Sequence, residues 1–360
     1  MSSADPAGPP LTPVRSRPDR ELIGPVTPRR YRVAVARDTS VDMAAGEVLA
    51  AAGRGDSAAF QHLMEPHLRA VHLHCYRMLG SYHDAEEAVQ ETLLRAWRGL
   101  DGFQHRAPLR HWLMRIATTT CLKAIERRGR TPATAAEVSY LQPYPDRLLD
   151  QLADRDADPA AIVDRRESVA LAFIAALQVL PGTQRAALIL RDVLAWPARD
   201  VADLLGTTVP AVNSALQRAR ATLAGGHGAA AGQGGLARDE RRVLDAFLRA
   251  WHASDIPALA ALLRDDATLT MPPESVRIVG RGAIAEFFAT VPAGGRLDTI
   301  RLVTTRANGH PALAAYLPDA GGVCRGYGIM VLTVSGGRVA TITGFPDPAL
   351  FPIFDLPLRS

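Results

Sequence analysis

Apolar residues recur at helical spacing through the first well-patterned part of the chain, residues 45–130. Phe60, Leu63, His67 and Val71 keep a spacing of three to four, which is the period of one face of an α-helix. The pattern breaks at Gly80, the kind of residue that ends helices. These positions predict a helical bundle.

Two further helices are predicted in this bundle. Asp84 is placed at an N-cap with Glu87 as its partner in a capping box, and that helix ends near Gly99. The last helix spans residues 109–128, with Trp112 facing inwards.

A second helical unit is predicted over residues 161–223. It begins with a long helix that runs through Val169 and Leu177. Pro181 then opens a turn, and Thr183 is expected to cap the next helix.

Residues 196–223 have the pattern of a helix-turn-helix. Ala202 is small enough to let two helices pack closely, Gly206 permits the positive φ of the turn, and Val212 anchors the second helix. The second helix has no acidic residue on its polar face, which suits the major groove of DNA. The candidate DNA-binding residues on this helix are Asn213, Ser214, Gln217, Arg218 and Arg220. An ordinary αα-hairpin is the alternative interpretation.

The pattern changes after residue 237. Helices are predicted over Arg238–Ser254, Ile256–Arg264 and Gly282–Thr290. Alternating stretches then predict strands over Leu297–Arg306, Ala312–Leu317, Val323–Val334 and Val339–Phe345. Helices followed by a meander, with a hairpin turn at 335–337, indicate an α+β domain over 238–350.

Four segments lack such patterning. Residues 1–44 are proline-rich and predicted to be disordered, and residues 224–237 form a flexible linker of small residues. Residues 131–160 form a second linker, and residues 351–360 a C-terminal tail. Apolar side chains in the second linker predict either docking onto a partner or a short local helix: Tyr140, Leu141, Tyr144 and Leu148.

Composition narrows the class of protein. The 360 residues carry a net charge of +4, and Lys123 is the one lysine among 41 basic residues. Cys75, Cys121 and Cys324 are scattered without zinc-ligand spacing, so we expect no metal, no cofactor and a reducing compartment. No apolar run of about 18 residues occurs. We therefore expect a cytoplasmic protein that makes no membrane contact.

The segment from residue 104 to residue 130 is strongly basic, with aromatic side chains interleaved. Basic groups bind phosphates, and aromatic groups beside them can stack unpaired bases. The candidate DNA-binding residues are Gln104, His105, Arg106, Arg110, Trp112, Arg115, Lys123, Arg127 and Arg128. The alternative is that Phe103 and Trp112 are core residues beneath a solvated basic face.

The preceding helix carries an acidic stripe, in which Asp84, Glu87 and Glu91 are three or four residues apart. A solvated face is the simplest interpretation. Because acid is unhelpful beside a DNA-binding segment, a protein partner is the sharper hypothesis, with Gln90 included.

Three segments together resemble an extracytoplasmic-function (ECF) sigma factor of bacterial RNA polymerase. They read DAEEAVQETLLRAWRGLDGF, LRHWLMRIATTTCLKAIERRGR and LPGTQRAALILRDVLAWPARDVADLLGTTVPAVNSALQRAR. The resemblance implies two all-α sigma domains, region 2 over 45–130 and region 4 over 161–223. It also implies core RNA polymerase (the β′ clamp and the β flap) and promoter DNA as partners, and a location in the cytoplasm at the nucleoid.

The resemblance also implies roles for individual residues. Asp84, Glu87, Gln90 and Glu91 would contact the β′ clamp. The loop 104–108 would capture a flipped base of the minus-ten element, and the helix 109–128 would hold its strand. The helix 209–221 would read the minus-thirty-five element. Many family members carry lysine or arginine where this chain has Asn213 and Ala215, which shifts the bases that are read.

Residues 238–350 resemble a SnoaL-like domain of the NTF2-like fold, a cone with a pocket. The expected role is modulation of the sigma domains in cis; an anti-sigma factor or a small-molecule ligand of the cone is a further candidate partner. An enzyme or ligand sensor in the cone is an alternative, because members of this fold use a carboxylate base in an apolar pocket. Its candidate polar groups are His252, Asp265, Asp266, Tyr316, Tyr327 and Asp347, which form no recognisable constellation.

A helix-turn-helix regulator that acts without polymerase is the other alternative function. It predicts a dimer on a palindromic site, but it leaves the acidic stripe and the basic segment unexplained. The leading prediction is therefore a non-catalytic subunit for transcription initiation.

Overall fold

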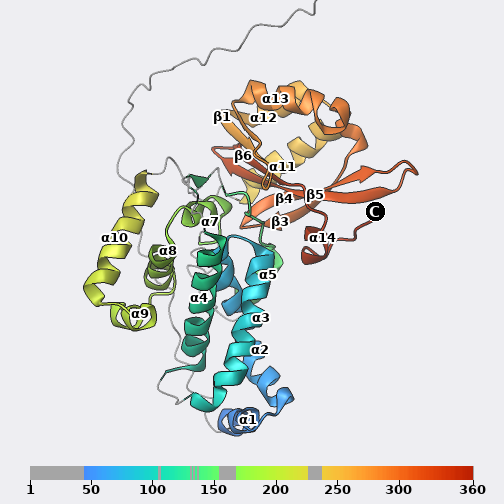
Figure 1. Ribbon diagram of the computed structural model, residues 1–360. Helices are drawn as coiled ribbons and strands as arrows, with labels where there is room; N and C mark the ends of the chain where they lie inside the picture. The colour runs from blue at the N-terminus through green and yellow to red at the C-terminus, as the bar shows by residue number, and fades with distance from the viewer. Residues whose placement is uncertain are drawn as a thin grey trace, which may run out of the picture.

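The computed structural model describes residues 44–103, 107–129, 132, 134–135, 138–153, 168–225 and 237–359. Two helical units lie beneath a sheet domain, with α10 on the outer side of the helical part (Figure 1). Three sets of residues lie outside the described part of the chain: residues 1–43 of the predicted disordered segment 1–44, the predicted loop residues Gln104, His105 and Arg106, and residues 226–236 of the predicted linker 224–237.

The first helical unit is a bundle whose elements follow the predicted breaks. It contains α1 (Ala44–Gly53), α2 (Ser57–Leu79), α3 (Tyr82–Gly99), the 3₁₀ turn η1 (Leu100–Gly102) and α4 (Leu109–Arg128). The predicted range of the last helix is confirmed at both ends. The predicted capping box is wrong, because Ser81 is the N-cap of α3 and its hydroxyl accepts from the Asp84 amide. Asp84 therefore lies in the first turn of the helix.

Gly80 is required by two features of the structure. Its φ is +75°, and a Cβ there would lie 2.8 Å from Cδ of Gln178, a residue of the second helical unit. A left-handed backbone costs an L-residue roughly 1–2 kcal/mol, and overpacking adds about 1–3 kcal/mol. We expect Gly80→Ala to lower the free energy of unfolding by the sum of both.

Gly206→Ala is the matched control for that prediction, measured by chemical denaturation. Gly206 has a φ of +60°, and nothing lies within 4 Å of its added Cβ, so it should lose only the backbone part. Equal losses for the two variants would show that the contact with Gln178 contributes nothing.

The predicted linker folds onto the bundle. It contains α5 (Asp146–Ala153), and Leu141 and Tyr144 are buried. Tyr144 packs beside the rings of His72, Tyr76 and Tyr82. The predicted local helix occurs at Leu148, whereas Leu141 and Tyr144 pack within this chain and not, in this structure, on a partner.

The second helical unit ends in the predicted helix-turn-helix. Its elements are α7 (Leu171–Gln178), α8 (Gly182–Leu188), the π-helical turn η3 (Ile189–Val193), α9 (Ala198–Leu205) and α10 (Val209–Gly225). Val169 lies in a turn before α7, and not in the helix that was predicted to include it. Thr183 does not cap α8, because the N-cap position is taken by Pro181 and makes no side-chain bond.

The C-terminal domain combines helices with one mixed sheet of six strands in the order β2-β1-β6-β5-β4-β3. The helices are α11 (Ala237–His252), α12 (Ile256–Leu262), α13 (Arg281–Thr290) and α14 (Leu350–Ile353). The strands are β1 (Leu263–Thr270), β2 (Arg277–Val279), β3 (Arg301–Ala307), β4 (His310–Pro318), β5 (Cys324–Ser335) and β6 (Arg338–Phe345). β1 and β6 are parallel, whereas the other neighbours are antiparallel.

Three predicted boundaries in this domain are corrected. The helix predicted over Ile256–Arg264 ends at Leu262, and β1 follows directly and contains Asp265 and Asp266. The predicted strand over 297–306 begins only at Arg301, after the 3₁₀ turn η5 (Leu297–Thr299). The predicted tail 351–360 contains most of α14, whose Phe351 is fully buried.

The two faces of the sheet pack against different parts of the molecule. One face, which includes Leu313 and Leu332, covers Phe247 and Trp251 of α11. The other face, which includes Ile329, shares a continuous core with α14 and the helical units. In Figure 1 the sheet accordingly lies between α11–α13 on one side and α5 and α14 on the other.

Candidate nucleic-acid and protein interfaces

The outward face of α10 is built by helical alternation. Val212, Ala215, Leu216 and Ala219 are buried against the unit, and Gly206 takes the left-handed conformation of the turn before the helix. All five predicted DNA-binding side chains on this helix are exposed: Arg220, and the group of four formed by Asn213, Ser214, Gln217 and Arg218. Amide, hydroxyl and guanidinium groups on one face can hydrogen-bond base edges and phosphates.

Arg220 differs from those four residues. Its Nη2 lies 2.6 Å from Oδ1 of Asp192 and its Nε 3.0 Å from Oδ2, and this pairing raises the pKa of the guanidinium. Asp192 belongs to η3, so the bidentate pair joins α10 to the π-helical turn that follows α8. No local pattern around Arg220 indicates this structural role.

The predicted basic helix α4 presents charges along its exposed side. Arg110, Lys123 and Arg127 are exposed, whereas Arg115 and Arg128 are partly buried. Trp112 is also partly buried, and its ring centroid lies 5.2 Å from that of Phe103.

The N-terminal half of α4 touches the helix-turn-helix unit. The rings of His111 and Trp196 lie 4.7 Å apart, and Arg115 Nη2 donates to the Asp203 carbonyl at 3.4 Å. Burial lowers the pKa of His111, and the charge of Arg110 acts in the same direction. The two predicted DNA-binding units therefore contact each other in this structure.

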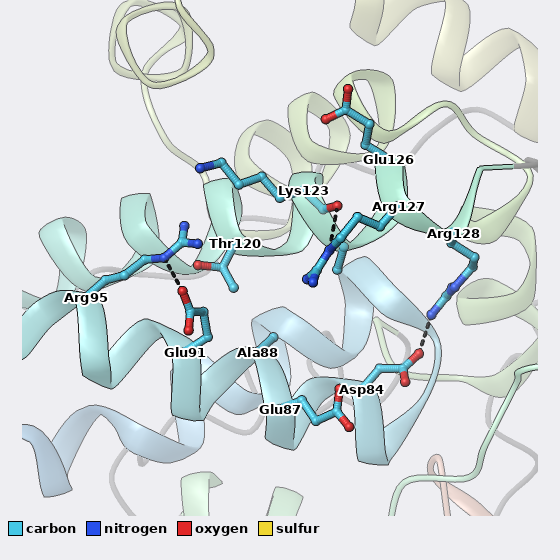
Figure 2. Close-up of a pocket in the computed structure, with 11 residues that line it drawn as sticks. Asp84, Glu87, Ala88, Glu91, Arg95, Thr120, Lys123, Glu126, Arg127 and Arg128 are labelled. Carbon is cyan, nitrogen blue, oxygen red and sulfur yellow. Dashed lines mark hydrogen bonds and ion pairs between the residues drawn. The ribbon is translucent and has the colours of Figure 1, made fainter.

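The acidic stripe of α3 faces the basic side of α4 across a groove of about 1110 Å³. Figure 2 shows Glu87 and Glu91 on one wall and Lys123 and Arg127 on the other. Glu91 pairs with Arg95 of its own helix at 2.7 Å. Gln90 is exposed on α3. The groove thus offers charges of both signs to a partner.

Asp84 and Arg128 form an ion pair across the end of this groove (Figure 2). These two residues belong to different predicted surfaces, one for a protein and one for DNA. They lie 44 positions apart, and no local pattern predicts contacts at that separation.

The junction between the C-terminal domain and the helical units centres on Asn308, which has no exposed surface. Its Oδ1 accepts from the Tyr144 amide at 2.8 Å, and its Nδ2 donates to the Tyr76 hydroxyl at 2.9 Å and to the Val169 carbonyl at 2.7 Å. Its own amide donates to the Tyr144 carbonyl at 2.8 Å. One side chain therefore binds the bundle, the linker and the start of the second helical unit.

A buried carboxylate reinforces this junction. Asp146 of α5 accepts from the Gly309 amide at 2.7 Å and from Arg306 Nε at 3.1 Å. Burial raises the pKa of Asp146, and the bonds from Gly309 and Arg306 oppose that shift. Residues of the hairpin between β3 and β4 thus form hydrogen bonds with both ends of the segment from Tyr144 to Asp146.

The candidate polar groups of the C-terminal domain do not converge. Asp265 and Asp266 are ion-paired to Arg281 and Arg264 at the surface. Tyr316 is buried and donates to the Pro357 carbonyl at 3.0 Å. The remaining groups lie apart from these: Asp347 accepts from the Ala349 amide, and His252 and Tyr327 are exposed.

In the described part of the chain no three His, Cys, Asp or Glu side chains gather in a way that could hold a metal ion. Likewise, none of the described helices is both long enough and apolar enough to span a bilayer.

Three segments match known families. Residues 63–131 match Sigma-70 region 2, residues 170–223 match Sigma-70 region 4, and residues 244–342 match the SnoaL-like domain.

Two curated relatives from Mycobacterium tuberculosis span all three segments. The ECF RNA polymerase sigma factor SigG is 42% identical over 322 residues, which cover 84% of this chain and 85% of the relative. SigJ is 29% identical over 305 residues, covering 80% and 91%. The crystal structure of SigJ matches the fold with a TM-score of 0.56 at 24% identity, over 81% of this chain and 96% of that one.

Proposed function

Because the chain belongs to the ECF sigma factors of RNA polymerase, we propose that it initiates transcription by binding the core enzyme through α3 and promoter DNA through α4 and α10. The observation that carries this proposal is the 42% identity to a sigma factor over 84% of the chain. The alternation of α10, which leaves its polar face outward, adds a physical reason for the DNA contact. A sigma factor is a specificity subunit and performs no catalysis as such.

Promoter recognition is divided between the two helical units, which we assign to residues 45–130 and 161–223. Asn213, Ser214, Gln217 and Arg218 would read base edges in the major groove of the minus-thirty-five element. The basic side of α4 would neutralise phosphates near the minus-ten element, with Trp112 beside the melted strand. Binding energy opens the duplex, because unpaired bases gain stacking contacts that paired bases cannot make.

Polymerase contact is assigned to the acidic stripe of α3. Glu87 and Gln90 are exposed, and Asp84 and Glu91 are partly exposed, so a basic partner surface can reach all four. Complementary charge increases the association rate and fixes the orientation of a complex.

We assign the SnoaL-like domain a regulatory role in cis and no enzymatic role. Its β3–β4 hairpin holds the segment from Tyr144 to Asp146 through Asn308 and Arg306. This segment belongs to the linker between the two DNA-binding units. The hydrogen bonds that hold it therefore limit how far the two units can separate. The scattered polar groups of the domain support the absence of catalysis.

Arg218 and Arg220 should respond differently to truncation. Arg218→Ala is expected to weaken promoter binding by the polymerase complex by about 1–3 kcal/mol, the size of one specific contact, without lowering the melting temperature. Arg220→Ala should instead cost up to about 1 kcal/mol of stability, as for an exposed ion pair. Fluorescence anisotropy on promoter DNA and thermal unfolding of each variant separate the two effects. The opposite assignment of effects would place Arg220, not Arg218, on the DNA.

Binding assays with and without polymerase test the proposed function against its main alternative. We expect the full chain to copurify with core RNA polymerase and to retain promoter DNA only in that complex. A regulator that acts alone would bind as a dimer to a palindromic site without polymerase, and that result would reject the proposal.

A further inference from the structure

The linker docks on the first turn of α3, immediately beside the acidic stripe. The Gln142 side-chain oxygen accepts from the Ser81 hydroxyl at 2.9 Å and from the His83 amide at 3.1 Å. The backbone amide of Gln142 donates to the Gly80 carbonyl at 3.0 Å. The amides at a helix N-terminus need an acceptor, and the linker supplies one. The helix that we assign to polymerase therefore begins at the docking point of the linker.

Arg128 ties the same turn to a second residue of the linker. Its guanidinium pairs with Asp84, and its Nη1 donates to the Leu79 carbonyl at 3.2 Å. Its Cζ also lies 3.6 Å from the centre of the Tyr140 ring, a cation–π contact. One arginine at the end of α4 therefore joins α2, α3 and the linker.

Tyr140 extends this connection to the second helical unit. Burial lowers the pKa of the Arg185 guanidinium of α8, and Tyr140 lies close enough to Arg185 to oppose that shift. Arg185 is 1% exposed and donates to the carbonyls of Met78 and Leu180. Asp84, Arg128, Tyr140 and Arg185 therefore follow one another from the acidic stripe to the helix-turn-helix unit.

We propose that the Asp84–Arg128 ion pair is a latch that couples polymerase binding to release of the linker. The proposal rests on the proposed function, in which polymerase contacts Asp84. A basic partner that takes the Asp84 carboxylate removes the charge that holds Arg128. Arg128 then leaves the Tyr140 ring, and the linker detaches from the first turn of α3. The partner in this step is a cationic protein surface.

Reciprocity gives the proposal a second consequence. If polymerase binding weakens linker docking by some factor, then the chain with its linker undocked must bind polymerase more tightly by the same factor than the docked chain. Gln142 holds the linker but lies outside the acidic stripe, so it reports this coupling without removing a polymerase contact. We expect Gln142→Ala to bind polymerase about 5- to 20-fold more tightly, within the usual range of coupling between sites.

The groove contains a matched control. Glu91 and Arg95 form an ion pair at 2.7 Å on α3 alone, four residues apart. Both pairs unite a carboxylate of the stripe with an arginine, but only Arg128 also touches the linker. Arg95→Gln therefore removes the same charge as Arg128→Gln without opening the latch.

Hydrogen exchange of residues 138–148 in the full chain, with and without core RNA polymerase, tests the latch. Arg128→Gln should raise exchange of this segment at least about 10-fold in the free chain, and Arg95→Gln should leave it unchanged. Polymerase should raise the same exchange in the unsubstituted chain. Tyr140→Leu, which leaves the helices intact, should match Arg128→Gln.

Two results would overturn the latch. The first is polymerase binding that leaves linker exchange unchanged; the second is equal exchange in the Arg128→Gln and Arg95→Gln variants. Failure of the unsubstituted chain to bind polymerase at all would instead reject the proposed function.

Discussion

Asn308→Ala is expected to separate the C-terminal domain from the sigma domains in the folded protein. The side chain makes three hydrogen bonds to the Tyr144 amide, the Tyr76 hydroxyl and the Val169 carbonyl. Losing it leaves the Tyr144 amide and the Val169 carbonyl without this partner at about 1–3 kcal/mol each, or on the order of 2–6 kcal/mol in total, whereas the Tyr76 hydroxyl still donates to the Gln142 carbonyl. Differential scanning calorimetry should then show the two parts melting separately, with the sigma part at the lower temperature.

Asn308→Gly controls for the backbone at this position. Asn308 has a φ of +55°, which glycine adopts freely and alanine does not. Both variants lack the side-chain bonds, so both should uncouple the domains, and alanine should cost roughly 1 kcal/mol more. A single transition at the original temperature in both variants would contradict the role given to Asn308.

Charge reversal in the acidic stripe is expected to have the largest effect on activity. Glu87→Lys combined with Glu91→Lys should weaken binding of core polymerase about 100-fold, equivalent to ~2.8 kcal/mol. The physical reason is that two attractive contacts with a basic surface become repulsive. Surface plasmon resonance with immobilised polymerase measures the change.

Glu86→Lys is the matched control for the stripe. Glu86 is exposed on the same helix, and its Oε2 lies 3.9 Å from Nδ1 of His83. The groove is lined instead by Glu87 and Glu91. Glu86→Lys changes the charge of one residue by the same amount as Glu87→Lys or Glu91→Lys, but at a position outside the stripe. A comparable loss of affinity in this variant would mean that overall charge, and not the stripe, determines polymerase binding.

Features set by local chemistry could be predicted from the sequence. The limits of α4 follow from apolar spacing between Pro108 and Gly129, and the helix-turn-helix follows from Gly206 and Val212. The hairpin between β5 and β6 follows from Gly336 and Gly337, which both adopt positive φ. In each case the residues that decide the structure are neighbours in the sequence.

Local chemistry was misjudged where two capping residues competed. Ser81 and Asp84 both suit an N-cap, and only the linker contact shows why Ser81 is used: its hydroxyl also donates to Gln142. Thr183 was expected at the N-cap of α8, but Pro181 occupies that position, and its fixed φ suits the start of a helix.

The contacts between domains could not be predicted. Asn308 lies 164 positions from Tyr144, and a polar residue before a glycine in a hairpin predicts only a turn. The pairing of Asp84 with Arg128, and of Arg220 with Asp192, likewise depends on how helices pack. Sequence patterns therefore identified the candidate surfaces but not which of their charges are already paired.

Reconstituted run-off transcription tests the central claim most directly. The full chain and core RNA polymerase from a high-GC bacterium would be incubated with fragmented genomic DNA, and the transcripts sequenced. Initiation by this protein predicts discrete start sites that share two spaced upstream elements, with Asn213 or Gln217 variants altering the distal one. No specific transcripts, from either the full chain or residues 1–223 alone, would contradict the account.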